Sequence, residues 1–303
     1  MMLFGTQCAI VYLRRGDKAM SKFKLGVMHG NYGLPFDEVL EKAARLGLEG
    51  IQLSRIRDEF APGNMPPARL KEVLDQVKSH GLVFSAICGE QLYGFTERER
   101  NAQLIENSKR ILDMAKELET NIVTTHIGVV PDDTGSETYK VMQEACFELA
   151  EYADSLQAHF AIETGPEVSA TLKVFLDTLG SRGVAVNLDP ANLVMVVGDD
   201  PVQAVYNLKD YIVHTHAKDG KRLRKGDVNH LYATAQAEQY HGEYLVERPL
   251  GRGDVGFPKY LAALKDIGYS GFLTIEREVE DFRAEDIAYG AGYLRGLINP
   301  PAH

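Results

Sequence analysis

The sequence predicts a single α/β domain, a closed (β/α)8 TIM barrel, and three observations support that prediction. A short apolar run followed by a longer amphipathic segment recurs eight times between Lys24 and Leu297. No change in composition separates these units, and 303 residues that are 45% hydrophobic can bury one large core. The first strand is followed by neither a Gly-x-Gly-x-x-Gly turn nor a phosphate loop, which disfavours a doubly wound sheet. Strand-helix units in series of this kind close into a barrel.

Eight short apolar runs, bounded by glycine or polar residues, are predicted as the strands. They span residues 24–29, 50–54, 82–88, 121–127, 159–163, 183–188, 211–219 and 271–275. The helices are predicted from apolar residues at helical spacing. They cover 35–46, a segment that ends at 81, 97–118, 136–157, 168–179, a short stretch after 201, 257–267 and 284–297. The seventh strand reaches its helix only after a long loop, residues 220–256.

Residues 1–19 are predicted to be an N-terminal extension that packs loosely, and residues 20–303 to be the barrel domain. Met20 and the residues after it resemble a natural start. The extension places its apolar part before Arg14 and Arg15, which is the wrong order for a secretory signal. No stretch approaches the ~20 apolar residues that a membrane span needs. We therefore expect no membrane partner.

The net charge and the cysteine content limit the classes of partner that we expect. The net charge is −10 and the longest basic cluster is the short run 221–225, so a nucleic acid is not expected as the main partner. The three cysteines are too few and too scattered for a disulfide framework or a thiolate metal site. We expect a reducing, cytoplasmic location and a small-molecule substrate.

The stretch Tyr211–Asp219 carries two histidines on one face of a predicted buried strand. Residues two apart in a strand share a face, so His214 and His216 point the same way and Thr215 points oppositely. One interpretation is two core histidines, each satisfied by a hydrogen bond. The other is that His216, nearest the carboxyl end of the strand, is a metal ligand and that His214 lies one layer deeper. The ends of the other strands decide between these interpretations.

Polar side chains end most of the predicted strands, at the face where barrels of this class hold their active sites. They are His29, Gln52, Glu90, His126, Glu163, Asp189, His216 and Glu276. Any one carboxylate at such a position could be a helix cap. Four of these residues, however, come from the last four strands in succession, and three carboxylates at one mouth would repel one another without a cation. A divalent metal with three carboxylates and one histidine follows. Mn²⁺ is favoured, with Mg²⁺, Co²⁺, Fe²⁺ and Zn²⁺ as alternatives.

Five segments together resemble the xylose isomerase-like barrel superfamily, and within it the sugar phosphate isomerase/epimerase group with its ketose 3-epimerases and inosose dehydratases. They are Ala161–Glu163, Asn187–Asn192, Val213–Asp219, Pro249–Asp254 and Leu273–Glu276. The resemblance implies that the metal ligands are Glu163, Asp189, His216 and Glu276. It also matches Arg222, six residues after the metal histidine, to a substrate-contacting arginine of the ketose 3-epimerases.

The sequence departs from the ketose 3-epimerases at two positions. Asn192 stands where those enzymes have a substrate-binding histidine. Ser169 stands where they have a second glutamate, and Glu167 is only an approximate substitute. These departures leave the identity of the sugar open.

The expected activity is that of a metal-dependent sugar isomerase or epimerase acting on a ketose or related polyol. A metal-polarised carbonyl makes the neighbouring carbon acidic, and Glu163 and Glu276 could remove and return its proton through an enediolate. If a hydroxyl leaves instead, the enzyme is an inosose dehydratase-like lyase. The candidates for substrate binding are His126, Arg222, Asn192, His29 and Glu90. A capped strand end and a solvated basic loop are the alternative interpretations of His126 and Arg222.

Three further classes are weighed against this expectation. A carbon–glycoside cleaving subunit would use the same enolate chemistry and could need a partner chain. An abasic-site endonuclease would need further histidine and aspartate ligands and a basic groove, which the net charge disfavours. A non-catalytic sugar-binding barrel would not need the metal ligands. The long loop, with Tyr232, Tyr240, His241 and Tyr244, could cover the mouth or form a homo-oligomer contact.

Overall fold

The computed structural model describes residues 23–54, 56–228, 242–279 and 283–299. The predicted extension 1–19 lies outside these residues. So do three of the aromatic positions named for the long loop, Tyr232, Tyr240 and His241.

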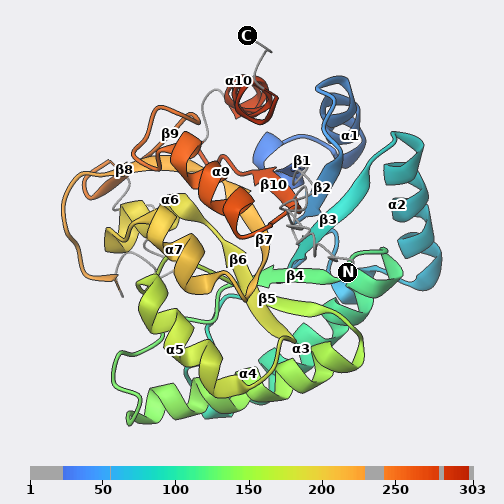
Figure 1. Cartoon of the computed structure of the whole chain (residues 1–303). Coiled ribbons are helices and arrows are strands. Elements are labelled where there is room, and N and C mark those ends of the chain that lie inside the picture. Colours follow the sequence, from blue (N-terminus) through green and yellow to red (C-terminus); the bar gives the residue numbers. More distant parts are fainter. Residues whose placement is uncertain (1–22, 55, 229–241, 280–282, 300–303) are drawn as a thin grey trace, which may run out of the picture.

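Eight parallel strands close into a barrel, as the sequence predicted (Figure 1). The order around the barrel is β1-β10-β7-β6-β5-β4-β3-β2, and β1 pairs with both β10 and β2. The strands are β1 Lys24–Met28, β2 Gly50–Leu53, β3 Val83–Cys88, β4 Ile122–Thr125, β5 His159–Glu163, β6 Val184–Leu188, β7 Ile212–Ala217 and β10 Phe272–Ile275. The strands that carry the predicted metal ligands, β5, β6, β7 and β10, are neighbours in this order.

The helices surround the strands (Figure 1). They are α1 Phe36–Arg45, α2 Pro67–Ser79, α3 Arg98–Glu117, α4 Glu137–Ser155, α5 Ser169–Leu179, α7 Pro201–Leu208, α9 Phe257–Asp266 and α10 Arg283–Ile298. Shorter helical turns are η1 His29–Tyr32, η2 Pro62–Asn64, α6 Pro190–Asn192 and η3 Leu193–Val197. The sequence placed helix only after Pro201 in this region. It missed α6 and η3 because the run from Leu193 to Val197 is apolar throughout and has no polar face at helical spacing.

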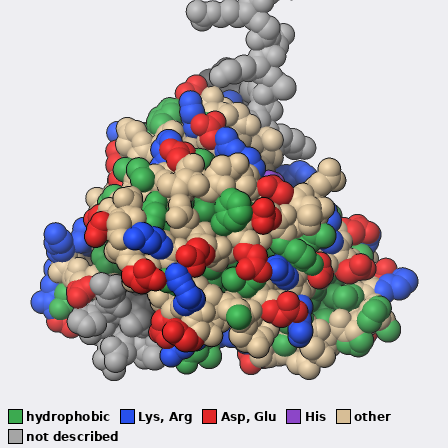
Figure 2. Space-filling model, turned by 90° about the horizontal axis from the view of Figure 1, so that it is seen from below, with side chains coloured by type: hydrophobic (Ala, Val, Ile, Leu, Met, Phe, Trp, Pro, Cys, Tyr) green, Lys and Arg blue, Asp and Glu red, His purple; other side chains and the backbone are tan. Residues whose placement is uncertain are grey.

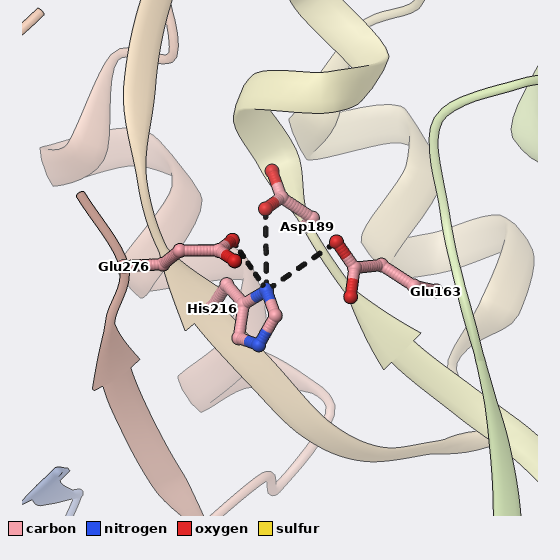
Figure 3. Close-up of side chains that lie close together, drawn as sticks. All are labelled: Glu163, Asp189, His216 and Glu276. Atoms are coloured by element: carbon pink, nitrogen blue, oxygen red, sulfur yellow. Dashed lines mark hydrogen bonds and ion pairs between the residues drawn. The ribbon is translucent and has the colours of Figure 1, made fainter. Parts of the chain in front are cut away.

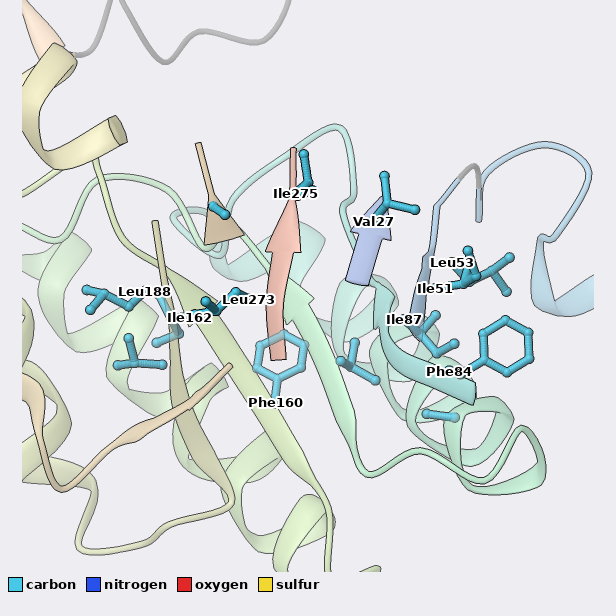
Figure 4. Packing of buried hydrophobic residues seen from close by; sticks show 14 of the residues in the cluster. Val27, Ile51, Leu53, Phe84, Ile87, Phe160, Ile162, Leu188, Leu273 and Ile275 are labelled. Carbon is cyan, nitrogen blue, oxygen red and sulfur yellow. The ribbon is translucent and has the colours of Figure 1, made fainter. Parts of the chain in front are cut away.

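The hydrophobic core lies between the strands and the helices. Phe160 and Ile162 of β5 and Leu273 and Ile275 of β10 are at most 1% exposed and belong to this cluster (Figure 4). Side chains alternate along a strand, so the residues between them point into the barrel. Thr274 is one of these, and its hydroxyl lies 2.9 Å from His214 Nε2 of β7. The barrel interior is therefore polar and hydrogen-bonded near its carboxyl end.

The long loop between β7 and α9 begins and ends in an antiparallel ribbon, β8 Asp219–Arg222 with β9 Leu245–Arg248. The seventh strand was predicted to run through residue 219, but it ends at Ala217, and Asp219 opens the ribbon. The Asp219 carboxylate accepts four backbone N–H groups, from Gly220, Gly251, Gly253 and Val255. A Cβ atom on Gly253 would collide with this carboxylate, so the turn before α9 requires glycine there.

Acidic and basic side chains are interspersed on the face shown in Figure 2. Ion pairs between helices are typical of this surface, for example Lys109 of α3 with Glu148 of α4 at 2.7 Å. Pairs this exposed contribute roughly 0–1 kcal/mol each, so the helices are held mainly by apolar packing. Within the described ranges, no helix has both the length and the apolar character to cross a membrane.

Candidate metal centre and active site

The carboxyl ends of four neighbouring strands bring the four predicted metal ligands together (Figure 3). Glu163 ends β5, Asp189 follows β6, His216 lies in β7 and Glu276 follows β10. Each offers one ligand atom, and these atoms all lie within 4.8 Å of one another. All four side chains are buried, with exposures between 0% and 7%. The cluster could hold a metal ion.

His216 directs one ring nitrogen at the three carboxylates and the other away from them. Its Nδ1 lies 2.9 Å from Glu276 Oε2, 3.3 Å from Asp189 Oδ2 and 3.6 Å from Glu163 Oε1. Its Nε2 lies 3.0 Å from Oε1 of Gln52, on the far side of the barrel. The nitrogen available to a cation among the carboxylates is therefore Nδ1.

Asp189 caps a helix with one oxygen and faces the cluster with the other. Its Oδ1 accepts the backbone N–H of Asn192 at 2.8 Å, which starts α6, with Pro190 at the first helical position. Its Oδ2 faces His216. Its backbone is fixed by Thr164, whose hydroxyl lies 2.8 Å from Asp189 N and 2.9 Å from Asp189 O. The Asp189 side chain can therefore cap α6 and face the cluster at the same time.

Two asparagines hold the Glu163 carboxylate. The amide of Asn187 donates to Oε2 at 3.1 Å, and the amide of Asn192 donates to Oε1 at 3.0 Å. Asn192 was predicted to bind substrate. In the structure its side chain contacts a predicted metal ligand, because α6 carries it back over the end of β5.

The electrostatics of the cluster show that its carboxylates need positive charge. Burial lowers the pKa of His216, but Glu276 and Glu163 outweigh burial and raise it well above its ordinary value. Burial raises the pKa of Glu163 and of Glu276, but His216, together with His126 at Glu163 and Lys218 at Glu276, outweighs burial and lowers both. Three oxygen donors and one imidazole nitrogen form a set that suits a divalent cation such as Mn²⁺ or Mg²⁺. The residues present fit such an ion.

His126 and Glu90, both predicted to bind substrate, form a pair beside the cluster. Nδ1 of His126 lies 2.9 Å from Glu90 Oε2, which also accepts the backbone N–H of His126. Nε2 of His126 lies 3.7 Å from Glu163 Oε1. Burial lowers the pKa of His126, but Glu163 and Glu90 outweigh burial and raise it to about 10. This pair places an imidazole of raised pKa next to Glu163.

His29 and Arg222, the other two predicted substrate contacts, lie in different surroundings. His29 is 1% exposed, and its ring meets Phe36 and Phe60 edge-on at centroid distances of 5.5 and 5.4 Å. Its Nδ1 accepts the backbone N–H of Ser54 at 3.0 Å. Arg222 lies on β8, and its guanidinium packs over Gly198 at the end of η3, where a Cβ atom would collide with it. Neither residue has a contact with the four-residue cluster among the described interactions.

Comparison with known protein families shows to which family the chain belongs. A profile described as Xylose isomerase-like TIM barrel matches residues 40–297. The chain belongs to this family. Among curated relatives, the inosose dehydratase of Lacticaseibacillus casei is 24% identical over 146 residues, which cover 47% of this chain and 48% of that protein. The chain thus spans about half the length of this relative.

Two solved structures match nearly the whole chain. A xylose isomerase domain protein from Planctomyces limnophilus is 25% identical with a TM-score of 0.74, and the match covers 91% of this chain and 96% of that one. D-psicose 3-epimerase, solved in the presence of D-fructose, is 17% identical with a TM-score of 0.69, covering 91% and 99%. The second likeness is one of fold.

Two buried side chains of this xylose isomerase-like barrel border the cluster but were assigned no role from the sequence. Lys218, 4% exposed, lies 3.3 Å from Glu276 and 2.5 Å from Glu278. Gln52 contacts His216 from across the barrel. Lys218 follows His216, a predicted metal ligand, by two residues, which was a usable signal. Gln52 was noticed as a strand end, but its partner lies 164 residues away in the sequence, so no local pattern could connect them.

Proposed function

We propose that this protein is a divalent-metal-dependent isomerase or epimerase that acts on a ketose or related polyol. The observation that carries the proposal is the convergence of Glu163 and Glu276, from β5 and β10, on one buried centre that His216 Nδ1 also faces. The proposed substrate is a free small sugar, and the proposed reaction removes a proton next to its carbonyl group.

The metal would be held by Glu163, Asp189, His216 and Glu276, and Mn²⁺ is the favoured ion. When bound, a divalent cation supplies Lewis acidity, which polarises a substrate carbonyl and offsets the negative charge that forms when the neighbouring carbon loses its proton. All three carboxylates are buried. Glu163 and Asp189 are held by hydrogen bonds, and Glu276 lies within ion-pair distance of His216 and Lys218.

Glu163 and Glu276 are proposed as the catalytic acid and base. The pKa of each is lowered, so each is ionised near neutral pH and able to accept a proton. Asn187 and Asn192 fix the plane of the Glu163 carboxylate, and Lys218 restrains that of Glu276. One carboxylate takes the proton from the substrate carbon. The other, which takes up a proton from solvent, delivers that proton to a different side of the carbon and so inverts it.

We propose different roles for the five residues that were predicted to bind substrate. His126, oriented by Glu90, is proposed to donate to a substrate oxygen next to Glu163. Asn192 is proposed to act on substrate only through Glu163. Arg222 is proposed as a contact from the ribbon. His29 is proposed as the support of the loop after β1, because its ring is enclosed by Phe36 and Phe60.

A dehydratase is the second candidate, and the cationic His126 favours it. An imidazolium beside the base could protonate a hydroxyl that leaves from the carbon next to the enolate, which converts the same chemistry into loss of water. The similarity to an inosose dehydratase supports the same alternative. A carbon–glycoside cleaving subunit would use the same groups, and a nuclease has the least support.

The test is to incubate the Mn²⁺-loaded protein with a panel of ketoses and inososes in deuterated water. Deuterium that enters next to the carbonyl without loss of water supports isomerase or epimerase action, and loss of water supports the lyase. No exchange with any member would contradict the proposed chemistry. We further propose that the protein acts in the cytoplasm. Light scattering of the purified chain would test whether it forms a homo-oligomer.

A further inference from the structure

Gln52 of β2 reaches His216 of β7 across the barrel interior. Its Oε1 lies 3.0 Å from His216 Nε2, and both side chains are fully buried. Since water does not reach this contact, the two groups must satisfy each other. The direction in which the proton is donated therefore depends on how the amide of Gln52 is oriented.

Thr124 of β4 contacts the other end of that amide. The Nε2 atom of Gln52 donates to Thr124 Oγ1 at 2.9 Å. A primary amide has one donor end and one acceptor end, so the end that faces His216 is the carbonyl oxygen. A carbonyl oxygen can only accept, and Nε2 of His216 must carry a proton to meet it.

Asn187 lies beside the same nitrogen but cannot take this proton. Its Nδ2 atom is 3.2 Å from His216 Nε2 and donates to Glu163 Oε2 at 3.1 Å, while its Oδ1 faces His214 Nδ1 at 2.8 Å. Asn187 thus presents a donor to His216. Among the described side chains, Gln52 is the hydrogen-bond acceptor for Nε2.

A neutral imidazole carries one proton, so a proton held on Nε2 leaves a lone pair on Nδ1, the nitrogen that faces the carboxylates. We infer that Gln52, held by Thr124, is a positioning residue that selects Nδ1 of His216 as the cation-binding atom. This inference rests on the metal site of the proposed function. Residues that fix the second nitrogen of a ligating histidine typically change metal affinity by 10–100-fold when replaced.

The test compares Mn²⁺ affinities by calorimetry. Gln52→Met removes the acceptor at similar volume and is expected to weaken binding by about 10–100-fold. Gln52→Glu keeps an acceptor and is expected to bind at least as tightly as the native protein. Thr124→Val, which frees the amide to turn, is expected to weaken binding several-fold. The double variant Gln52→Met/Thr124→Val is expected to bind no more weakly than Gln52→Met alone, because both changes act through one hydrogen bond.

Two matched controls separate positioning from general damage. Thr120→Val makes the same change in the segment that leads into β4, where the hydroxyl donates to the Ser85 carbonyl. Asn101→Leu removes another buried amide, which contacts the carbonyls of Phe95 and Val141. Both controls are expected to bind Mn²⁺ as the native protein does. Thermal unfolding checks that each variant is folded.

Each outcome has a defined meaning. Native affinity in folded Gln52→Met, or in Thr124→Val should Gln52→Met not fold, overturns the inference and leaves the metal site standing. Additive losses in the double variant overturn the role of Thr124. An Nδ1-protonated His216 in ¹⁵N spectra of the Mg²⁺-loaded protein also overturns the inference. Absence of Mn²⁺ binding by the native protein overturns the proposed function and the inference together.

Discussion

Two layers of side chains inside the barrel each contain one histidine of β7, yet they differ in charge. The upper layer is Glu163, Asp189, His216 and Glu276, and the lower layer is Ser85, Asn187, His214 and Thr274. The rings of His214 and His216 are 5.7 Å apart, centroid to centroid. Burial, together with the neighbouring His216, lowers the pKa of His214 well below its ordinary value. The carboxylates raise that of His216 despite its burial.

The difference shows that the neighbours of a histidine decide its chemistry, since the strand face and the burial are the same. His214 meets neutral partners on both ring nitrogens, Asn187 Oδ1 at 2.8 Å and Thr274 Oγ1 at 2.9 Å. His216 meets three carboxylates on Nδ1. Both interpretations of the paired histidines are therefore realised in one strand: a satisfied core residue in the lower layer and a candidate ligand in the upper one.

The largest expected effect comes from the upper layer. Glu163→Gln keeps the shape of the side chain but removes the base, so exchange of substrate hydrogen for deuterium should slow by about 10³-fold. Circular dichroism should show an unchanged fold. Glu144→Gln, on an exposed face of α4, is the matched control and should react at the native rate. A native rate in Glu163→Gln would remove this residue from the mechanism.

A matched pair of substitutions tests the two layers against each other. His216→Leu should weaken Mn²⁺ binding by about 100-fold or more, because it removes a ligand rather than a supporting partner. His214→Leu should keep the affinity within about tenfold. It should instead lower the free energy of unfolding by about 1–3 kcal/mol, because it removes the partner of Asn187 Oδ1 and one of the partners of Thr274 Oγ1. Calorimetry and urea unfolding measure the two quantities, and exchanged effects would refute the assignment of layers.

Removal of the metal should affect stability only through the upper layer. With free Mn²⁺ at about 100 times the dissociation constant, binding contributes about 2.7 kcal/mol. Addition of a chelator should therefore lower the unfolding midpoint of the native protein by about 5 °C. In His216→Leu the chelator should have almost no effect. An equal drop in both proteins would mean that the ion binds elsewhere.

The smallest effect concerns Glu167, a buried carboxylate four residues beyond Glu163. Burial raises its pKa to about 8, although the N–H of Val130 and the charge of His126 oppose the rise. The folded state thus holds this proton more tightly than the unfolded chain, and the stability due to Glu167 is lost as the pH rises from about 4.5 to about 8. In urea unfolding, the stability of Glu167→Gln relative to the native protein should therefore increase as the pH rises from 5 to 8. A constant difference would contradict this.

Much of the fold and the composition of the cluster could be predicted because both follow from local pattern. Each strand is an apolar run of a few residues, and parallel strands in a barrel end at one face, so residues that follow strands meet there. Glu163, Asp189, His216 and Glu276 obey this rule. The bounds of α3, α5 and α9 agree with prediction to within a residue or so, because apolar spacing and flanking polar residues mark them.

The rest depended on contacts that no local pattern records. The ribbon pairs Arg222 with Leu245, and its two strands are too short and polar to be recognised alone. Whether a polar residue at a strand end faces the cluster depends on its partners. The side chain of Asn192 reaches Glu163 because Asp189 caps the start of α6. His29 is enclosed by aromatic rings from α1 and from the segment after β2.

Four backbone N–H groups donate to the Asp219 carboxylate and so fix both the start and the end of the loop between β7 and α9. The start of this loop, at Gly220, and its end, at Gly251, Gly253 and Val255, bind the same carboxylate. The segment between these two attachment points could therefore be replaced by one of another length or composition without disturbing the strands of the barrel.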